Sequence, residues 1–185
     1  MARLGLVFLI TILVGTAAFI VRGETARGAS AIGERAALTT YVAQIEPLRL
    51  AVNRLLEEAD PILGAYREHR IPARVAAGRF SRLEQRFAGY TIQIAAIRPT
   101  TPELTRLQRV YLHTYFYEDA YLSALAAALP ARDFESLPHT ANLQRAMIIE
   151  WRTGLHVLAQ RLGVPLPADL AVAGRGEIAP SPEGS

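Results

Sequence analysis

Apolar residues recur at helical spacing along most of this chain, and no useful stretch alternates with a period of two. At about 100° per residue, the first apolar stripe after the N-terminal region predicts a long helix over residues 31–69. Pro47 and Pro61 lie inside it. Because Asp60 before Pro61 has the form of an N-cap followed by proline at the first helical position, we expect the helix to break there.

A second helix is predicted by the most regular apolar spacing in the chain, with alternating steps of three and four residues. Its stripe consists of Phe80, Leu83, Phe87, Tyr90, Ile94 and Ile97. A third helix is opened by the capping sequence Thr101-Pro102-Glu103 and closed by Pro130.

A fourth helix is predicted over residues 138–162, where Gly163 ends the periodic pattern. We expect its inner face to carry Leu143, Met147, Trp151, Gly154, Leu158 and Leu162. Ile148 and Ile149 are expected on other sides of this helix, where they need something to cover them.

The N-terminal region carries the strongest apolar signal, an uninterrupted uncharged run over residues 4–21. At a rise of about 1.5 Å per residue, such a run is close to the thickness of the hydrocarbon core of a bilayer. It is longer than the apolar region of most cleaved signal peptides, and Arg22 ends it abruptly. We therefore expect an uncleaved signal-anchor that makes the protein a single-pass membrane protein.

The predicted fold class is all-α: an N-terminal transmembrane helix, an antiparallel four-helix bundle and a disordered C-terminal tail. A bundle is the simplest way for four amphipathic helices with short connections to bury their apolar stripes. Residues 1–22 are the predicted anchor, 23–30 a linker, 31–163 the bundle and 164–185 a flexible tail. The short flank before the apolar run favours an extracytoplasmic (periplasmic or cell-surface) bundle, although the flanking arginines are nearly balanced.

Composition excludes several kinds of chemistry. There is no cysteine, so disulfides, thiolate metal sites and thiol nucleophiles are ruled out. All twenty cationic residues are arginine, which rules out lysine-based Schiff-base and P-loop chemistry. The histidines are spread one to an element and no Glu-x-x-His pair occurs, so we assign no metal site and no cofactor.

The densest chemistry lies in the third helix, in the stretch YLHTYFYEDAY at residues 111–121. Helical spacing places Glu118 in the middle of the apolar stripe, where a carboxylate needs a hydrogen bond or a counter-charge. One interpretation is a proton-accepting or ligand-binding acid beside Tyr111, Tyr115 and Trp151. The other is a buried polar tie to a tyrosine or to an arginine such as Arg86 or Arg161.

Charge is concentrated in the middle of the chain. Residues 67–109 contain nine arginines and three glutamates. Arg79, Arg82 and Arg86 share one side of the second helix, and Phe116 projects from the outer side of the third. These four residues are the candidate contacts for another protein subunit. The alternative for the arginines is a solvated face, and an extracytoplasmic address argues against nucleic acid as a partner.

Three hypotheses about function follow. The first is a non-catalytic accessory or scaffolding subunit, anchored in the bilayer by residues 4–21 and bound to other membrane protein subunits. The second is an extracytoplasmic small-molecule sensor or carrier, with the ligand inside the bundle near Glu118. The third, an enzyme using Glu118 as acid or base, requires a second polar group facing that carboxylate. We favour the first, with the sensor as the alternative.

Overall fold

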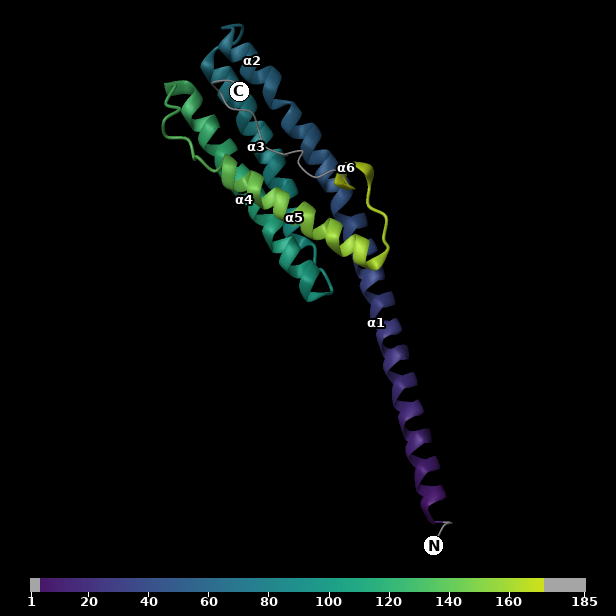
Figure 1. Ribbon diagram of the computed structural model, residues 1–185. Coiled ribbons are helices and arrows are strands. Elements are labelled where there is room, and N and C mark those ends of the chain that lie inside the picture. Colours follow the sequence, from purple (N-terminus) through teal and green to yellow (C-terminus); the bar gives the residue numbers. More distant parts are fainter. Residues whose placement is uncertain (1–3, 172–185) are drawn as a thin grey trace.

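The computed structural model describes the backbone of residues 4–171 and the side chains of residues 30–170, and every regular element in this part is a helix. The order is α1 (Leu4–Glu57), α2 (Ala59–Arg67), α3 (Ala73–Ala96), α4 (Pro102–Ala131), α5 (Ala141–Leu162) and α6 (Ala168–Ala171) (Figure 1). The predicted all-helical class is confirmed.

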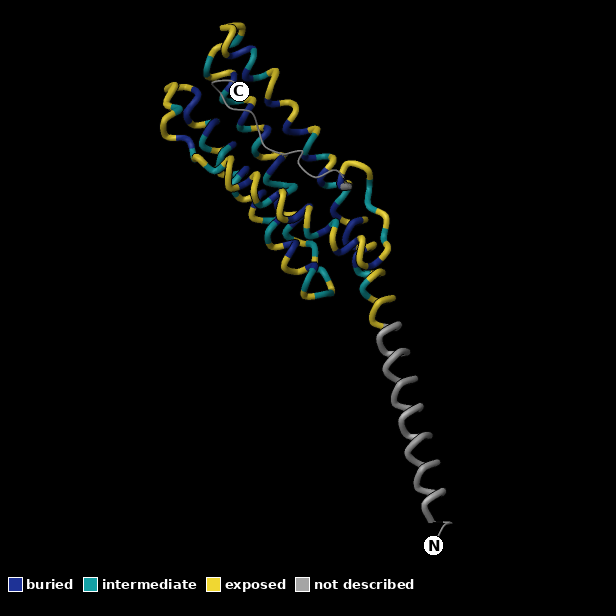
Figure 2. Tube along the Cα trace, viewed as in Figure 1, coloured by how far each residue is buried: buried dark blue, intermediate teal, exposed yellow. Residues whose placement is uncertain are grey.

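The helices form a bundle. α3 packs most extensively against α4, α4 then packs against α5, and α3 also contacts both α1 and α2. The turn between α2 and α3 lies at the end of the bundle opposite the one at which α1 enters it (Figure 1). Buried positions follow the inward sides of the helices, as Figure 2 shows. The predicted helical bundle is therefore confirmed.

Helix boundaries follow local chemistry. The Thr101 side chain accepts a hydrogen bond of 3.3 Å from the Leu104 amide at the start of α4, as the capping sequence predicted. Gly163 ends α5 with φ of 63°, a left-handed conformation that glycine adopts without strain. The break after α1 falls at Glu58 rather than at Asp60. Pro61 then lies in the first turn of α2, where a missing amide proton costs no helical hydrogen bond.

The core is continuous along the bundle. Its aromatic members come from every long helix, and the aliphatic ones are mostly leucine. Among the largest side chains with less than 2% exposure are Tyr41, Phe80, Phe87, Tyr111 and Trp151. Phe80 and Phe87 lie on the apolar stripe predicted for the second helix, and Trp151 lies on the predicted inner face of the fourth.

The predicted inner face of α5 is partly wrong. Leu143 is 50% exposed, whereas Gln144 and Ile148 are buried to 2% exposure each. Trp151, Leu158 and Leu162 are buried as expected, and Ile149 is exposed. α5 is thus rotated from the expected orientation. The cause is the hydrogen bond that Gln144 makes to Glu118 of α4.

The segment after α5 packs against the bundle. α6 lies within the predicted tail of residues 164–185, and Leu170 in it is buried to 1% exposure. Residues 172–185, the rest of that predicted tail, lie outside the described residues. The predicted linker over residues 23–30 is helical backbone within α1.

Within residues 30–170, whose side chains the structure describes, no helix is long and apolar enough to cross a bilayer. The predicted anchor, residues 4–21, lies outside the residues whose side chains the structure describes.

Two helical glycines give a matched test of packing. A Cβ atom at Gly154 would lie 2.5 Å from Cδ2 of the buried Leu107, where α5 contacts α4, whereas a Cβ at Gly89 meets nothing within 4 Å. We expect Gly89→Ala to raise the free energy of unfolding by about 0.5–1 kcal/mol through helix propensity. Gly154→Ala should be at least about 1 kcal/mol less stable than Gly89→Ala because overpacking opposes that gain. Chemical denaturation followed by circular dichroism measures both; equal stabilisation would contradict the close α4–α5 contact.

Candidate functional site

Glu118 lies in the core of the bundle with 1% of its surface exposed. Gln144 Nε2 on α5 donates to Glu118 Oε2 over 2.6 Å and to the Thr114 carbonyl over 3.2 Å. Arg86 and Arg161, the cations suggested by the sequence, lie instead at the surface, where they bind Glu58 and Glu103. A buried amide thus serves the carboxylate, and this explains why α5 turns Gln144 inward.

The other predicted ligand residues form an aromatic stack beside Glu118. The rings of Tyr111 and Trp151 are parallel within 16° with centroids 3.9 Å apart. Tyr115 stacks on Phe87 at 5.5 Å, and its hydroxyl lies 3.1 Å from that of Tyr111. The structure therefore brings Tyr111, Tyr115 and Trp151 into one cluster, with Glu118 one helical turn beyond Tyr115.

A second buried hydrogen-bond chain ties four helices together. Trp151 Nε1 donates to the Tyr41 hydroxyl over 3.1 Å, and that hydroxyl donates to Gln108 Oε1 over 2.9 Å. Gln108 Nε2 in turn donates to the Ile94 carbonyl over 2.7 Å. Burial raises the pKa of Tyr41, which the hydrogen bond from Trp151 only partly offsets. Tyr41 is therefore a neutral hydroxyl that both accepts and donates across the core.

Sequence reasoning missed the two buried amides, Gln108 and Gln144. Gln108 directly follows Leu107 within the apolar stripe of α4, so its helical position was a usable signal. Gln144 gave no such signal, because the neighbouring Leu143 fitted the expected stripe better.

The interior near Glu118 is filled. The cavity there measures about 10 Å³ and is lined by Val52, Phe87, Thr114, Tyr115, Glu118 and Gln144. That is close to the smallest volume that holds one water molecule, whereas small-molecule pockets span about 300–1,000 Å³. The arrangement satisfies polar groups within a packed core and leaves no room for an organic ligand at this level.

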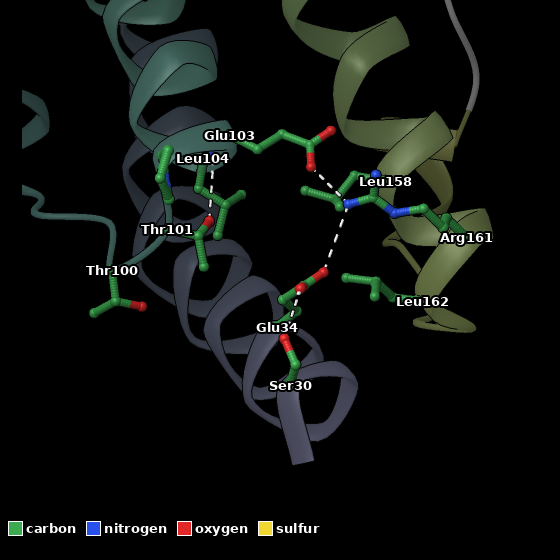
Figure 3. Close-up of a pocket in the computed structure, with 10 residues that line it drawn as sticks. Ser30, Glu34, Thr100, Thr101, Glu103, Leu104, Leu158, Arg161 and Leu162 are labelled. Atoms are coloured by element: carbon green, nitrogen blue, oxygen red, sulfur yellow. Dashed lines mark hydrogen bonds and ion pairs between the residues drawn. The ribbon is translucent and has the colours of Figure 1, made fainter. Parts of the chain in front are cut away.

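A larger cleft of about 500 Å³ lies where α1 enters the bundle. It is lined by Ser30 and Glu34 of α1, by residues 100–104 at the start of α4, and by Leu158, Arg161 and Leu162 of α5. Figure 3 shows Arg161 reaching across it, with Nη2 2.6 Å from Glu103 Oε2 and 3.7 Å from Glu34 Oε2. No sequence pattern pointed to this cleft because its walls come from three separate segments.

The predicted partner contacts are accessible. Arg79 and Arg82 are exposed on α3, and Arg86 forms two hydrogen bonds to Glu58 at 2.6 and 2.9 Å while remaining 55% exposed. Phe116 is 49% exposed on α4, with its ring centroid 6.2 Å from that of His113. Arg86 is thus held in place by an ion pair within the bundle.

Two carboxylates occupy a less favourable environment. Burial raises the pKa of Asp119 on α4 and of Glu84 on α3, and the charge of Asp119 raises that of Glu84 further. Asp119 Oδ1 is buried without a hydrogen-bond partner. Over the residues described, no three His, Asp or Glu side chains gather closely enough to hold a metal ion.

Comparison of the chain with protein-family models, with curated proteins and with solved structures found no match.

The role of Gln144 is tested by a pair of adjacent substitutions. Gln144→Leu removes a donor to the buried carboxylate of Glu118 and should lower the free energy of unfolding by about 2–4 kcal/mol. Leu143→Gln, at the half-exposed neighbouring position, should change it by no more than about 0.5 kcal/mol. Urea denaturation of both variants decides between the observed rotation of α5 and the one expected from the apolar stripe, which predicts the reverse order.

The charge of Asp119 makes stability depend on pH. Because folding raises the pKa of Asp119 above its ordinary value of 3.8, the folded state favours the neutral acid. The contribution of Asp119 to the free energy of unfolding is therefore fully present at pH values below this ordinary pKa and is lost as the pH rises above it. Asp119→Asn should therefore stabilise the bundle at pH 7, by at most about 1 kcal/mol given its partial exposure, and should bring no gain at pH 3. Urea titrations at both pH values measure the difference, with the exposed Asp133→Asn as control; a gain that is equal at both pH values would refute this origin.

Proposed function

We propose that this protein is a non-catalytic, membrane-anchored helical bundle that acts as an accessory or scaffolding subunit of a membrane protein complex. The observation that carries the proposal is a filled interior beneath outer faces that still expose large apolar side chains. Protein contact sites are typically built from exposed apolar side chains that lie next to one another. The most exposed of these side chains are Ile32, Ile92, Phe116, Leu143, Ile149 and Val157.

The interior of the bundle favours a structural role for Glu118 over binding of a substrate or ligand. A catalytic acid needs access to substrate, but Glu118 is almost fully buried and its cavity is about the size of one water molecule. Gln144 donates to this carboxylate and to the Thr114 carbonyl, and both hydrogen bonds join α5 to α4. We therefore infer that Glu118 is a structural tie and that function lies on the surface.

The anchor in this proposal is the apolar run over residues 4–21, followed by the bundle on the extracytoplasmic side of the membrane. Arg79, Arg82 and Phe116 supply exposed charge and apolar area for a partner. The α2–α3 turn stands at the end of the bundle away from the entry of α1 (Figure 1), so contacts near it are made well above the bilayer surface.

One observation favours the sensor or carrier as a second candidate. The cleft of about 500 Å³ beside Arg161 has the volume of a small-molecule site, unlike the cavity at Glu118. A ligand in this version binds at the end of the bundle where α1 enters.

The proposal is tested by the native mass of the protein after extraction from its own membranes in mild detergent. We expect stoichiometric co-migration with other membrane subunits, because an accessory subunit is held by its complex. Phe116→Ser should weaken that co-migration at least about tenfold if this side chain is a buried anchor of the interface. Gln85→Ser, at an exposed position of α3, is the control. A lone monomer or a small homo-oligomer contradicts the accessory role and leaves the cleft as the place to search for a ligand.

A further inference from the structure

Two arginines are buried on facing sides of α1 and α5. Arg49 is 1% exposed and Arg152 is 3% exposed, although a guanidinium group is usually found in contact with water. A guanidinium taken out of water requires hydrogen-bond acceptors that are held in place around it. The partners of these two side chains therefore define a built polar site rather than a solvated face.

Both arginines reach the same residue, Asp169 of α6. Arg49 Nη2 forms an ion pair with the Asp169 carboxylate, and Arg152 Nη1 donates to the Asp169 carbonyl over 3.2 Å. Arg49 is oriented by Glu46, which accepts from Nε at 3.1 Å and from Nη2 at 3.0 Å. The carboxylate of Asp169 is thus bound by α1, and its main-chain carbonyl is bound by α5.

Leu170 adds an apolar contact to these two polar ones. Its side chain is 1% exposed and belongs to the same core cluster as Leu155 and Trp151. Carboxylate, carbonyl and leucine side chain are recognised together within two consecutive residues. Such a combination of main-chain and side-chain contacts is how proteins bind short peptide segments.

Residues 164–170, the segment that contains Asp169 and Leu170, lie on the outer side of the two buried arginines. The Asp169 side chain is 44% exposed, whereas both arginines beneath it are almost fully buried. The segment reaches this place through a short connection after Gly163, where Val164 donates to the Ala159 carbonyl over 2.9 Å. Figure 1 shows α6 beside α1, at the end of that connection. The arginines belong to the bundle, and residues 164–170 cover them.

We propose that the seam between α1 and α5, with Arg49 and Arg152 at its base, is a binding socket for a short peptide segment carrying an aspartate followed by a leucine. Residues 164–170 fill the socket in the same chain and compete with a partner's segment of the same chemistry. The existence of a partner rests on the proposed function. The socket specifies how that partner is recognised, through an aspartate followed by a leucine.

Competition sets the condition for partner binding. A segment tethered by a few residues has an effective concentration of the order of millimolar, so a free peptide competes poorly with it. A partner segment held next to the bundle in a membrane complex has a comparable effective concentration and displaces residues 164–170 far more easily. The socket is therefore selective for partners that are already close.

The test uses the full chain in detergent and a fluorescently labelled peptide with the sequence of residues 164–171. In the chain carrying Asp169→Asn and Leu170→Ala, the tethered segment is weakened and the socket should bind the peptide at least tenfold more tightly than the unmodified chain does. A peptide with asparagine in place of its aspartate is the matched control and should bind at least tenfold more weakly. Equal binding of the two peptides by the folded double variant, or no binding at all, overturns the proposal.

A second measurement keeps the test valid if the double variant does not fold. In the unmodified chain the Leu170 amide donates to the Pro167 carbonyl over 3.0 Å, so displacement of the segment should speed hydrogen exchange in residues 168–171. We expect this acceleration with millimolar peptide and not with the asparagine control; exchange that is unchanged by both peptides overturns the proposal. Because the probe is the chain's own sequence, failure of the socket is distinct from failure to co-migrate with membrane subunits.

Discussion

The orientation of α5 in the bundle depends on the hydrogen bond from Gln144 to the buried carboxylate of Glu118. A carboxylate inside a helical core must have a donor, and Gln144 supplies it from α5. Once Gln144 faces inward, helical geometry brings the residues four, seven and eight positions later to the same side. These are Ile148, Trp151 and Arg152, all of them buried. One polar contact therefore orients α5 against α4, the Trp151 ring on Tyr111, and Arg152 toward the C-terminal segment.

Buried polar groups in this bundle define the relative positions of the helices. The chain from Trp151 through Tyr41 to Gln108 connects α5, α1 and α4 and ends on a carbonyl of α3. Apolar stripes alone tolerate sliding and rotation, whereas each of these hydrogen bonds has one geometry. These buried hydrogen bonds therefore favour one packing arrangement of the helices over others.

Sequence periodicity gave the helices and most of the core, because an apolar stripe has to be buried wherever it occurs. Phe80 and Phe87 are buried as their apolar stripe predicted. The orientation of α5 could not be derived in the same way, since Leu143 and Gln144 differ by one position and only a buried carboxylate on another helix decides between them. The predicted ligand residues do cluster, but whether a cluster is hollow depends on side-chain packing across helices. Neither the cleft beside Arg161 nor the contact of Asp169 with Arg49 has a local signature, because their parts lie far apart in the sequence.

The contact between Asp169 and Arg49 also bears on the order in which the protein assembles. The α3–α4 hairpin and the α4–α5 pair join neighbours in the sequence and close short loops, so they form readily as the chain emerges. The contact with Asp169 joins α1 to α6, a segment that is synthesised only after α1 to α5 are complete. A newly made bundle consequently passes through a stage in which Arg49 and Arg152 face an uncovered seam. In the accessory role proposed above, insertion into a complex during this interval would not require displacement of residues 164–170, so the timing of synthesis would help to determine which partner is bound.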